Sequence, residues 1–284
     1  MTMIESIKFE NGEYGLKAIL TSGWSSEMGA YLINKKIVEL ELNDGKGWRG
    51  DDISFLIKLP HLRSLKIIDF KISSVDQIHC LHELRELEII TYCKSEIRFS
   101  AFPVLEICAL EWRPKANSLF DCLSLKKLFI NSYSGKNTSE FAKLLNLEFL
   151  AILNAPVENL LGLKVLNKLR SLRLANLKRL SSLDGIECLS NLEELEIHTC
   201  RGISSISPVG YLKHLRKLHL NNDGNIDSLK PLVELNKLES ILFYESTNII
   251  DGDLTPLLNK QLSQVSFQNR RHYSHKREEF AGRQ

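Results

Sequence analysis

The stretch of sequence that decides the fold is "LRSLKI", which runs from Leu62 to Ile67. The same phrase returns as "LRELEI" at Leu84, "LRSLRL" at Leu169 and "LEELEI" at Leu192. Eleven copies can be aligned, and they begin at Ile37, Leu62, Leu84, Leu105, Leu125, Leu147, Leu169, Leu192, Leu215, Leu238 and Leu262. Neighbouring copies start 20 to 25 residues apart. This internal repeat predicts a chain built from coils of one kind.

Within each copy the apolar residues predict a β-strand. The first, fourth and sixth positions are apolar and are expected to point inward, while the third and fifth face outward. The segment after a strand often has an apolar residue at every third position, as at Val157, Leu160, Leu163 and Leu166. A period of three suits a short 3₁₀ or extended segment. Because one coil cannot bury its own apolar edge, the coils are predicted to stack around a continuous core.

The pattern resembles the leucine-rich repeat family, in the 22-residue class shared by internalins and phosphatase-regulatory subunits. The resemblance covers residues 37–268. It implies an α/β-type leucine-rich repeat solenoid of about eleven coils, strand-rich, with a 3₁₀ or extended convex side and a curved parallel sheet on the concave face.

The sequence departs from the family two residues after each strand, where the family usually places a buried asparagine. The residues at that position are Phe70, Tyr92, Arg113, Tyr133, Ala155, Leu177, Cys200, Asp223 and Ser246. We expect the aromatic side chains of Phe70, Tyr92 and Tyr133 to be buried there and to replace the asparagines in the early coils.

The ends of the chain predict caps. Residues 1–36 form an N-terminal cap, in which "IESIKFENGEYGLKAIL" predicts two strands around a glycine-rich turn. The stretch "SSEMGAYLINKK" then predicts a short helix with Ser25 or Ser26 as its N-cap. Residues 37–268 form the solenoid, and residues 269–284 form a basic C-terminal cap or tail.

Composition excludes several classes of protein. The chain has 284 residues, a formal net charge of +2 and 43% hydrophobic residues, which is enough for a sizeable core but too little charge to indicate nucleic-acid binding. No uncharged apolar run is long enough for a membrane span. The start, Met1 to Glu10, contains acids and does not look like a signal peptide. The six cysteines form no C-x-x-C pair, so we expect reduced thiols in a cytoplasmic protein.

A glycine motif raises the alternative of nucleotide binding. Gly45, Gly47 and Gly50 form G-x-G-x-x-G directly after the predicted strand at residues 37–42. A dinucleotide site would need a helix that opens at the glycines, but Pro60 closes a stretch that is barely long enough. The acids that flank the loop would repel a pyrophosphate; they are Asp44, Asp51 and Asp52. We therefore favour a long loop in the first coil, with nucleotide binding at Gly45–Gly50 as a remote alternative.

Other chemical motifs are weak. His79, Cys80 and His82 lie close together, but no second group of ligands follows at a spacing that suits zinc. No serine or cysteine has a matched base that the sequence identifies. We therefore predict no enzyme, no catalytic residue, no metal and no cofactor.

The outward strand positions predict a binding surface with an apolar centre between acidic margins. The apolar centre includes Ala109, Ala151 and Ala175. The acidic margin begins at the first coil with Glu39 and Glu41. Trp112 is one residue out of step with the other aromatics and is expected to be exposed. The predicted partner-binding residues are Ile107, Phe129, Phe149, Leu153, Glu86, Glu88, Glu194, Glu196, His198, Tyr244 and Trp112.

This surface predicts a non-enzymatic protein–protein interaction protein, with a monomer favoured. The partner is expected to be a protein with an apolar knob in a basic surround. A nucleic acid is not expected, because the glutamates would repel its phosphates. Two biological roles fit: an inhibitor or immunity-type protein against a basic toxin or nuclease, and a regulatory or scaffold subunit of an enzyme such as a phosphatase.

Overall fold

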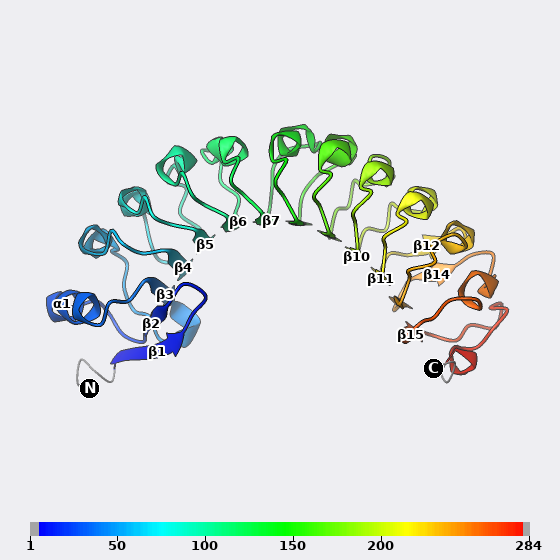
Figure 1. The fold of residues 1–284 in the computed structure, drawn as a ribbon, viewed down its shortest axis with the longest axis horizontal. Coiled ribbons are helices and arrows are strands. Elements are labelled where there is room, and N and C mark those ends of the chain that lie inside the picture. The colour runs from blue at the N-terminus through cyan, green and yellow to red at the C-terminus, as the bar shows by residue number, and fades with distance from the viewer. Residues whose placement is uncertain (1–5, 281–284) are drawn as a thin grey trace. The chain divides into compact units, whose positions relative to one another are not determined.

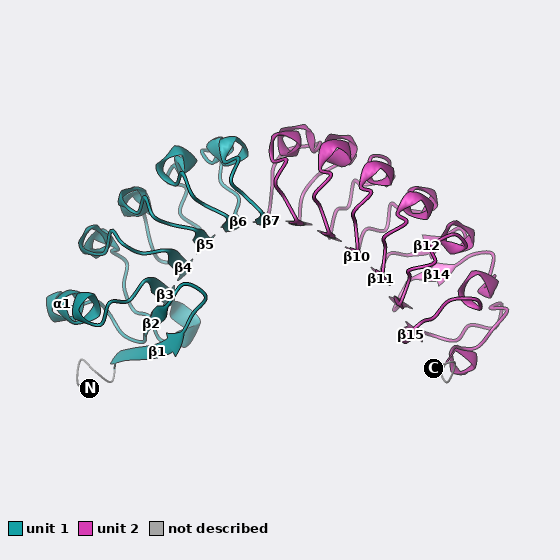
Figure 2. Ribbon diagram, viewed as in Figure 1, with its two compact units in different colours: residues 1–130 teal, residues 131–284 magenta. Residues whose placement is uncertain are grey.

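The protein is built from stacked coils, as seen in a computed structural model that describes residues 6–280. Thirteen strands belong to a mostly parallel sheet and follow one another in the order of the chain. The chain divides into two compact units, residues 1–130 and 131–284 (Figure 2). Within each unit every coil runs from a strand on one side to a 3₁₀ segment on the other (Figure 1).

Unit 1 contains the N-terminal hairpin, the α-helix and the first coils. Its strands and helix are β1 (Ile7–Asn11), β2 (Leu16–Leu20), α1 (Ser26–Asn34), β3 (Glu39–Asn43), β4 (Ser64–Ile68), β5 (Glu86–Ile90), β6 (Ile107–Glu111) and β7 (Lys127–Asn131), whose last residue belongs to unit 2. Its 3₁₀ segments are Asp44–Lys46, Ser54–Lys58, Asp76–Cys80, Phe99–Ala101 and Asn117–Asp121.

Unit 2 continues the same pattern and adds a second, two-stranded sheet of β12 and β14. Its strands are β8 (Phe149–Leu153), β9 (Ser171–Ala175), β10 (Glu194–His198), β11 (Lys217–Asn221), β12 (Asn225–Ile226), β13 (Ser240–Tyr244), β14 (Asn248–Ile249) and β15 (Gln264–Phe267). Its 3₁₀ segments are Ser139–Lys143, Leu161–Val165, Ile186–Cys188, Ser207–Tyr211, Lys230–Leu232, Thr255–Leu257 and Arg277–Glu279.

The core consists of the inward positions of the repeat. Every template residue from Ile37 to Phe243 is buried, and only the last copy departs, with Leu262 and Val265 partly exposed. Parallel strands pair in register, so Leu65 lies beside Leu87 and Ile67 beside Ile89 in unit 1. Like residues therefore stack along each unit. The apolar residues spaced by three are buried at the 3₁₀ segments, as Leu160 is at the start of one of them. The predicted 3₁₀ segments are therefore confirmed.

Both ends of the described chain pack against the strands next to them. β1 and β2 pair antiparallel, and Ser25 is the N-cap residue of α1, although its side chain makes no capping hydrogen bond. At the other end, the ring of Phe280 is buried edge-on against Phe267, with centroids 5.9 Å apart. Residues 1–5 and 281–284, which the sequence also assigned to the caps, lie outside the described residues.

The glycine loop follows β3 as two short 3₁₀ segments, without the helix that a dinucleotide site would need. The N–H groups of its first two glycines are already used. Gly45 N–H donates to the Asn43 side chain at 2.9 Å, and Gly47 N–H donates to the carbonyl oxygen of Asp44 at 3.1 Å. The Trp48 side chain of this loop is buried in the core beside Phe55. The glycines therefore serve the fold of the first coil.

The two glycines should differ in their tolerance of alanine. Gly47 has a φ of 107°, and an added Cβ would lie 2.9 Å from the Thr21 carbonyl oxygen. An added Cβ at Gly45 would meet the Asn43 side chain, which can move. We expect Gly47→Ala to lower the free energy of unfolding by about 1–3 kcal/mol, and Gly45→Ala to cost clearly less. Urea unfolding followed by tryptophan fluorescence tests this, and equal losses would contradict it.

The buried position after each strand differs from the prediction in the early coils of unit 1. Asp69 and Thr91 are 2% exposed, whereas Phe70 and Tyr92 are 46% and 73% exposed, with ring centroids 4.7 Å apart. The expectation that Phe70 and Tyr92 are buried is wrong, because the chain turns inward one residue earlier in these coils. Tyr133, by contrast, is buried as expected.

In unit 2 an additional residue separates the strand from the buried position. It has a left-handed backbone, with φ between 51° and 59°, at Ser132, Asn154, Asn176, Thr199, Asn222 and Glu245. This conformation costs an L-residue energy, and asparagine tolerates it best. Hydrogen bonds offset the cost, because Asn154 N–H donates to Ala175 O at 2.9 Å and Asn176 Nδ2 donates to Asn154 Oδ1 at 2.5 Å.

Asp223 occupies one of these buried positions with an incompletely satisfied carboxyl group. Its Oδ1 accepts a hydrogen bond from Cys200 N–H at 2.7 Å, while its Oδ2 has no partner. Burial raises the pKa of Asp223 to about 7, against the hydrogen bonds from backbone N–H groups that lower it. The charged form is therefore disfavoured in the folded protein.

This carboxyl group should make stability fall as pH rises. The folded protein holds the Asp223 proton up to about pH 7, whereas the unfolded chain releases it near pH 4, so the destabilisation develops between these values. Asp223→Asn should be more stable than the wild type at pH 8, by about 1–3 kcal/mol, and should lose this advantage at pH 4. Urea unfolding at both pH values tests the expectation. An advantage that does not change with pH would contradict it.

Candidate functional site

The outer face of the sheet, formed by the outward side chains of the strands, is the surface on which the sequence placed the binding residues. Alternation along each strand leaves the first, third and fifth residues outside the core. Most of these side chains are half-buried, because neighbouring coils cover them from both sides. The face is described below for each unit.

The first part of the face in unit 1 is covered by the turn of the N-terminal hairpin. Tyr14 N–H donates to Glu39 Oε1 at 2.5 Å, and an added Cβ on Gly12 would collide with the same carboxylate. Glu39 is therefore only 4% exposed, and Glu41, which pairs with Lys17 and Lys46, is 1% exposed. The prediction that they form an open acidic margin is wrong, because the hairpin turn packs against the outer side of β3.

Glu41 anchors a small charged cluster beneath this cap. Its carboxylate accepts from Lys17 at 2.7 Å, from Lys46 at 2.9 Å and from Asn43 Nδ2 at 3.1 Å. Burial alone would raise the pKa of Glu41, but these three donors lower it to about 2. The group is therefore ionised in the folded protein throughout the neutral range.

The two other glutamates predicted for unit 1 are half-buried on β5, and each has a partner on β4. Ser64 Oγ donates to Glu86 Oε2 at 2.9 Å, and Lys66 forms an ion pair with Glu88 at 2.8 Å. The phenol of Tyr14 also lies in the field of Glu86, and burial together with nearby acids raises its pKa to about 12. Tyr14 belongs to this surface, although nothing in the repeat pattern indicated it.

The apolar residues predicted in unit 1 divide into two environments. Ile107 on β6 lies beside Glu86 in the register of the sheet and is half-buried, as is Phe129 on β7. Trp112 instead packs its ring against Phe120, with centroids 5.8 Å apart, and is half-buried rather than exposed.

In unit 2 the first apolar side chains of the face lie on β8. Phe149 and Leu153 of β8 are half-buried, while Ala151 between them is fully buried and is not part of the exposed surface. Leu153 lies beside Ala175 of β9. Leu242 and Tyr244, both half-buried on β13, give a second apolar region on the same face.

Charges between these two apolar regions are matched across neighbouring strands. Glu194 pairs with Lys217 at 2.5 Å, and Glu196 pairs with Arg173 at 2.6 Å. His198 Nε2 lies 3.4 Å from the same Glu196 carboxylate. Burial acts to raise the pKa of Glu196, but the hydrogen bond and charge of Arg173 hold it below its usual value. The acidic margin predicted here is therefore neutralised by cations that the repeat pattern did not pair with it.

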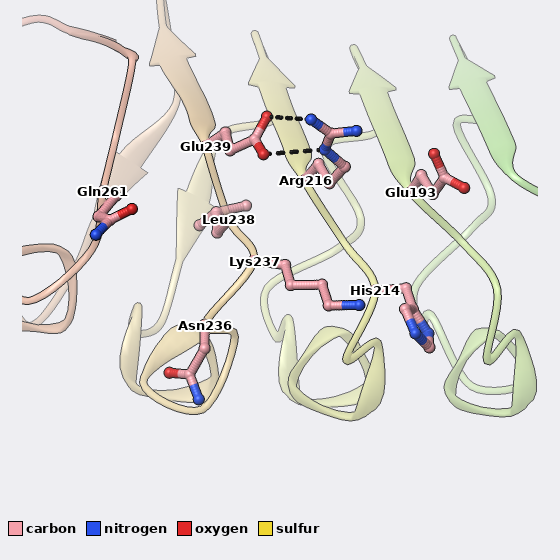
Figure 3. A pocket seen from close by; sticks show the side chains of 8 residues that line it. All are labelled: Glu193, His214, Arg216, Asn236, Lys237, Leu238, Glu239 and Gln261. Atoms are coloured by element: carbon pink, nitrogen blue, oxygen red, sulfur yellow. Dashed lines mark hydrogen bonds and ion pairs between the residues drawn. The ribbon is translucent and has the colours of Figure 1, made fainter.

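A hollow of about 450 Å³ lies outside this face, at the segments that precede the strands of unit 2 (Figure 3). Arg216 spans its rim and forms a bidentate pair with Glu239, with distances of 3.1 and 2.9 Å. His214 Nδ1 donates to the Ser190 carbonyl oxygen at 2.8 Å. Because its charged groups pair across adjacent coils, the hollow is explained by the stacking of those coils.

The weak chemical motifs serve the fold in the same way. His79 Nε2 accepts from Arg98 N–H at 2.9 Å, so its Nδ1 donates to the Asp76 carbonyl oxygen at 2.8 Å. Cys80 donates to the Gln77 carbonyl oxygen. Among residues 6–280, no group of three or more His, Cys, Asp or Glu side chains is placed to hold a metal ion. None of the helices in that range is both long and apolar enough to cross a membrane.

Comparison with solved structures identifies the fold. An internalin from Listeria monocytogenes str. 4b F2365 matches with a TM-score of 0.64 and 21% identity, over 89% of this chain and 86% of that chain. A TDR receptor matches with a TM-score of 0.64 and 17% identity, over 86% of this chain and 45% of the receptor. TLR13, in a complex with ssRNA13, matches with a TM-score of 0.56 and 21% identity, over 80% of this chain and 35% of that chain.

This chain therefore has the fold of a leucine-rich repeat solenoid, as the sequence predicted. It spans less than half the length of the TDR receptor chain and of the TLR13 chain. No family model matches the sequence. No curated protein matches it either.

The cluster around Glu41 gives a test of the capped part of the face. Its low pKa means that the stabilisation is fully present above the unfolded value near 4.3 and is lost as pH falls towards 2. We expect Glu41→Gln to lower the free energy of unfolding at pH 7 by about 1–3 kcal/mol, and the loss to shrink at pH 2.5.

Glu140→Gln is the matched control, because Glu140 and its partner Lys143 are both half exposed. An exposed pair contributes little, so this variant should change the urea midpoint slightly at either pH. A Glu41→Gln variant that behaved like the control would show that Lys17 and Lys46 do not stabilise the Glu41 carboxylate.

Proposed function

We propose that this chain is a non-enzymatic protein-binding module that takes its partner on the outer face of the strands. The observation that supports this most directly is the position of Phe149 and Leu153. Both side chains point away from the core of unit 2 and stay half-buried on an open sheet. The core does not need them, because Leu150 and Ile152 fill the inward positions of the same strand. Apolar groups grouped on an otherwise polar surface commonly mark a binding site.

The rigidity of the sheet supports the same proposal. Each outer side chain is held on a strand whose backbone is hydrogen-bonded to both neighbours, as β9 is to β8 and β10. A partner can therefore bind without ordering a loop first, which lowers the entropic cost of association. In unit 1, Ile107 and Phe129 offer apolar contacts of the same kind, beside the glutamates of β5.

The charge pattern defines the partner further. In unit 2 the two glutamates of β10 are matched by Arg173 and Lys217, so the polar part of the face is close to neutral. The proposed partner is a protein with an apolar knob and a mixed polar surround, and a strongly basic surround is not required. Paired charges at a rim orient a partner more than they strengthen its binding.

The biological role that we propose is inhibition of one partner protein, as in an immunity-type protein. A regulatory or scaffold subunit is the alternative, because any leucine-rich repeat face that binds a protein can serve either purpose. We place the protein in the cytoplasm as a monomer, and the six free cysteines support a reducing compartment. Affinity capture from the native host followed by mass spectrometry would identify the partner and separate the two roles.

Once the partner is known, Phe149→Ala combined with Leu153→Ala should weaken its binding by at least about a hundredfold, because buried apolar anchors dominate interface energies. Surface plasmon resonance should show the change mainly in the dissociation rate. Circular dichroism should be unchanged, since both residues lie outside the core.

Leu161→Ala is the matched control. Leu161 is 53% exposed on a 3₁₀ segment of the same unit, on the side opposite the strands. This variant should bind as the wild type does. If the Leu161 variant lost binding while the double variant kept it, the partner would use the opposite side and the proposed face would be wrong.

A further inference from the structure

The segment after β5 in unit 1 places three side chains with polar heads at alternate positions. Thr91, Cys93 and Ser95 come from the stretch "TYCKS", and Arg113 reaches them from the next coil. The Cys93 thiol is partly exposed, whereas Arg113 is 2% exposed. The cluster lies away from the outer face of the strands and is not needed for the proposed binding function.

Three donors converge on the sulfur of Cys93. Arg113 Nη1 lies 3.3 Å from Sγ, the Thr91 hydroxyl 3.2 Å and the Ser95 hydroxyl 3.6 Å. Thr91 Oγ1 already accepts from Arg113 Nη2 at 3.1 Å, and Ser95 Oγ already accepts from Val75 N–H at 3.0 Å. Each hydroxyl proton is therefore free to point at Sγ, an arrangement that suits a thiolate better than a thiol.

The buried guanidinium of Arg113 supplies a second, independent reason for an anion at this place. Among residues 6–280, no carboxylate forms an ion pair with Arg113, and its Nε has no hydrogen-bond partner. A buried cation without a counter-charge is costly. Among the described residues, the sulfur of Cys93 is the ionisable group in hydrogen-bond contact with this guanidinium.

Three exposed lysines lie around Cys93: Lys94 follows it directly, and Lys71 and Lys115 lie in the corresponding segments of the neighbouring coils. The acids of the same segments are the exposed Glu96 and the buried Asp69, whose carboxylate accepts from the N–H groups of residues 71 and 72. In the described part of the chain, no carboxylate lies within hydrogen-bonding distance of Sγ. Partly exposed cysteines in electropositive surroundings are the reactive ones.

We propose that Cys93 is a modification site, a thiolate that reacts with low-molecular-weight disulfides, above all anionic ones. In the reaction the Cys93 sulfur attacks one sulfur of the disulfide, the S–S bond breaks, and the other half leaves as a thiolate. The product is a mixed disulfide on Cys93, and no further oxidant is needed. The group would project beside the exposed ring of Tyr92.

Four of the five other cysteines differ from Cys93 in their contacts, and the fifth, Cys188, is exposed. Burial raises the pKa of Cys108, of Cys122 and of Cys200. Cys80 donates its proton to a backbone carbonyl, and burial raises its pKa as well. For Cys93, burial acts in the same direction, but the donors from Thr91, Ser95 and Arg113 outweigh it and lower the pKa.

The test measures how fast Cys93 reacts at different pH values. The full-length protein is treated with iodoacetamide from pH 5 to pH 10, and the labelled Cys93 peptide is quantified by mass spectrometry. The half-maximal rate should lie below the ordinary thiol value of about pH 8.5. Reaction with 5,5′-dithiobis(2-nitrobenzoate) at pH 7 should release one equivalent of thionitrobenzoate from Cys93 that Cys93→Ser does not release.

Two variants test the cause. Thr91→Val removes one donor at nearly constant shape, and Arg113→Gln removes the charge; both should move the Cys93 profile to higher pH. Lys143→Gln, on an exposed pair in unit 2, should leave it unchanged. If the Arg113→Gln variant does not fold, the pH profiles of Cys93 labelling in the wild type and in Thr91→Val test the proposal. A wild-type profile with its half-maximum at or above about pH 8.5 overturns the proposal, as does one that neither variant moves.

Discussion

The fold depends on one constraint, which is that a single coil cannot bury its own apolar edge. Each coil places three inward side chains and a row of residues spaced by three against the coils on either side, where they become fully buried. Because the strands pair in register, the same position of every coil meets its own equivalent, as Leu195 meets Leu172 and Leu218 in unit 2. Hydrophobic burial and backbone hydrogen bonding are therefore satisfied by the same stacking.

This division of labour leaves the outer face of the strands free for function. Outward side chains contribute little to the core, and they form local matches instead, such as Arg173 with Glu196 and Lys66 with Glu88. The apolar members, Phe149 and Leu153 above all, have no such role in the described residues. The same stacking also brings Arg113 of one coil to Cys93 of the previous one, so a chemically distinct site can arise between coils without changing the repeat.

The inward half of the fold could be predicted from the sequence, because the leucine periodicity records burial directly. The strand alternation, the 3₁₀ segments and the hairpin at the start all follow from local pattern. The buried residue that follows each strand could not be predicted from the sequence. A single left-handed residue such as Asn154 shifts its position by one, and for this reason the sequence places Phe70 in the core although the structure exposes it. For the candidate site, the sequence names outward residues but not their neighbours. Neither the cover of Glu39 by the hairpin turn nor the pairing of Glu194 with Lys217 appears in any single repeat.

The most direct test of the central claim, that a partner protein binds the outer face of the strands, is hydroxyl-radical footprinting of the free and the partner-bound protein. In the free protein, Phe149 and Leu153 should be labelled while the inward Leu150 is not. Addition of the partner should protect Phe149, Leu153 and Tyr244 and leave the exposed Leu145 of the opposite side unchanged. Protection of Leu145 with continued labelling of Phe149 would contradict the account.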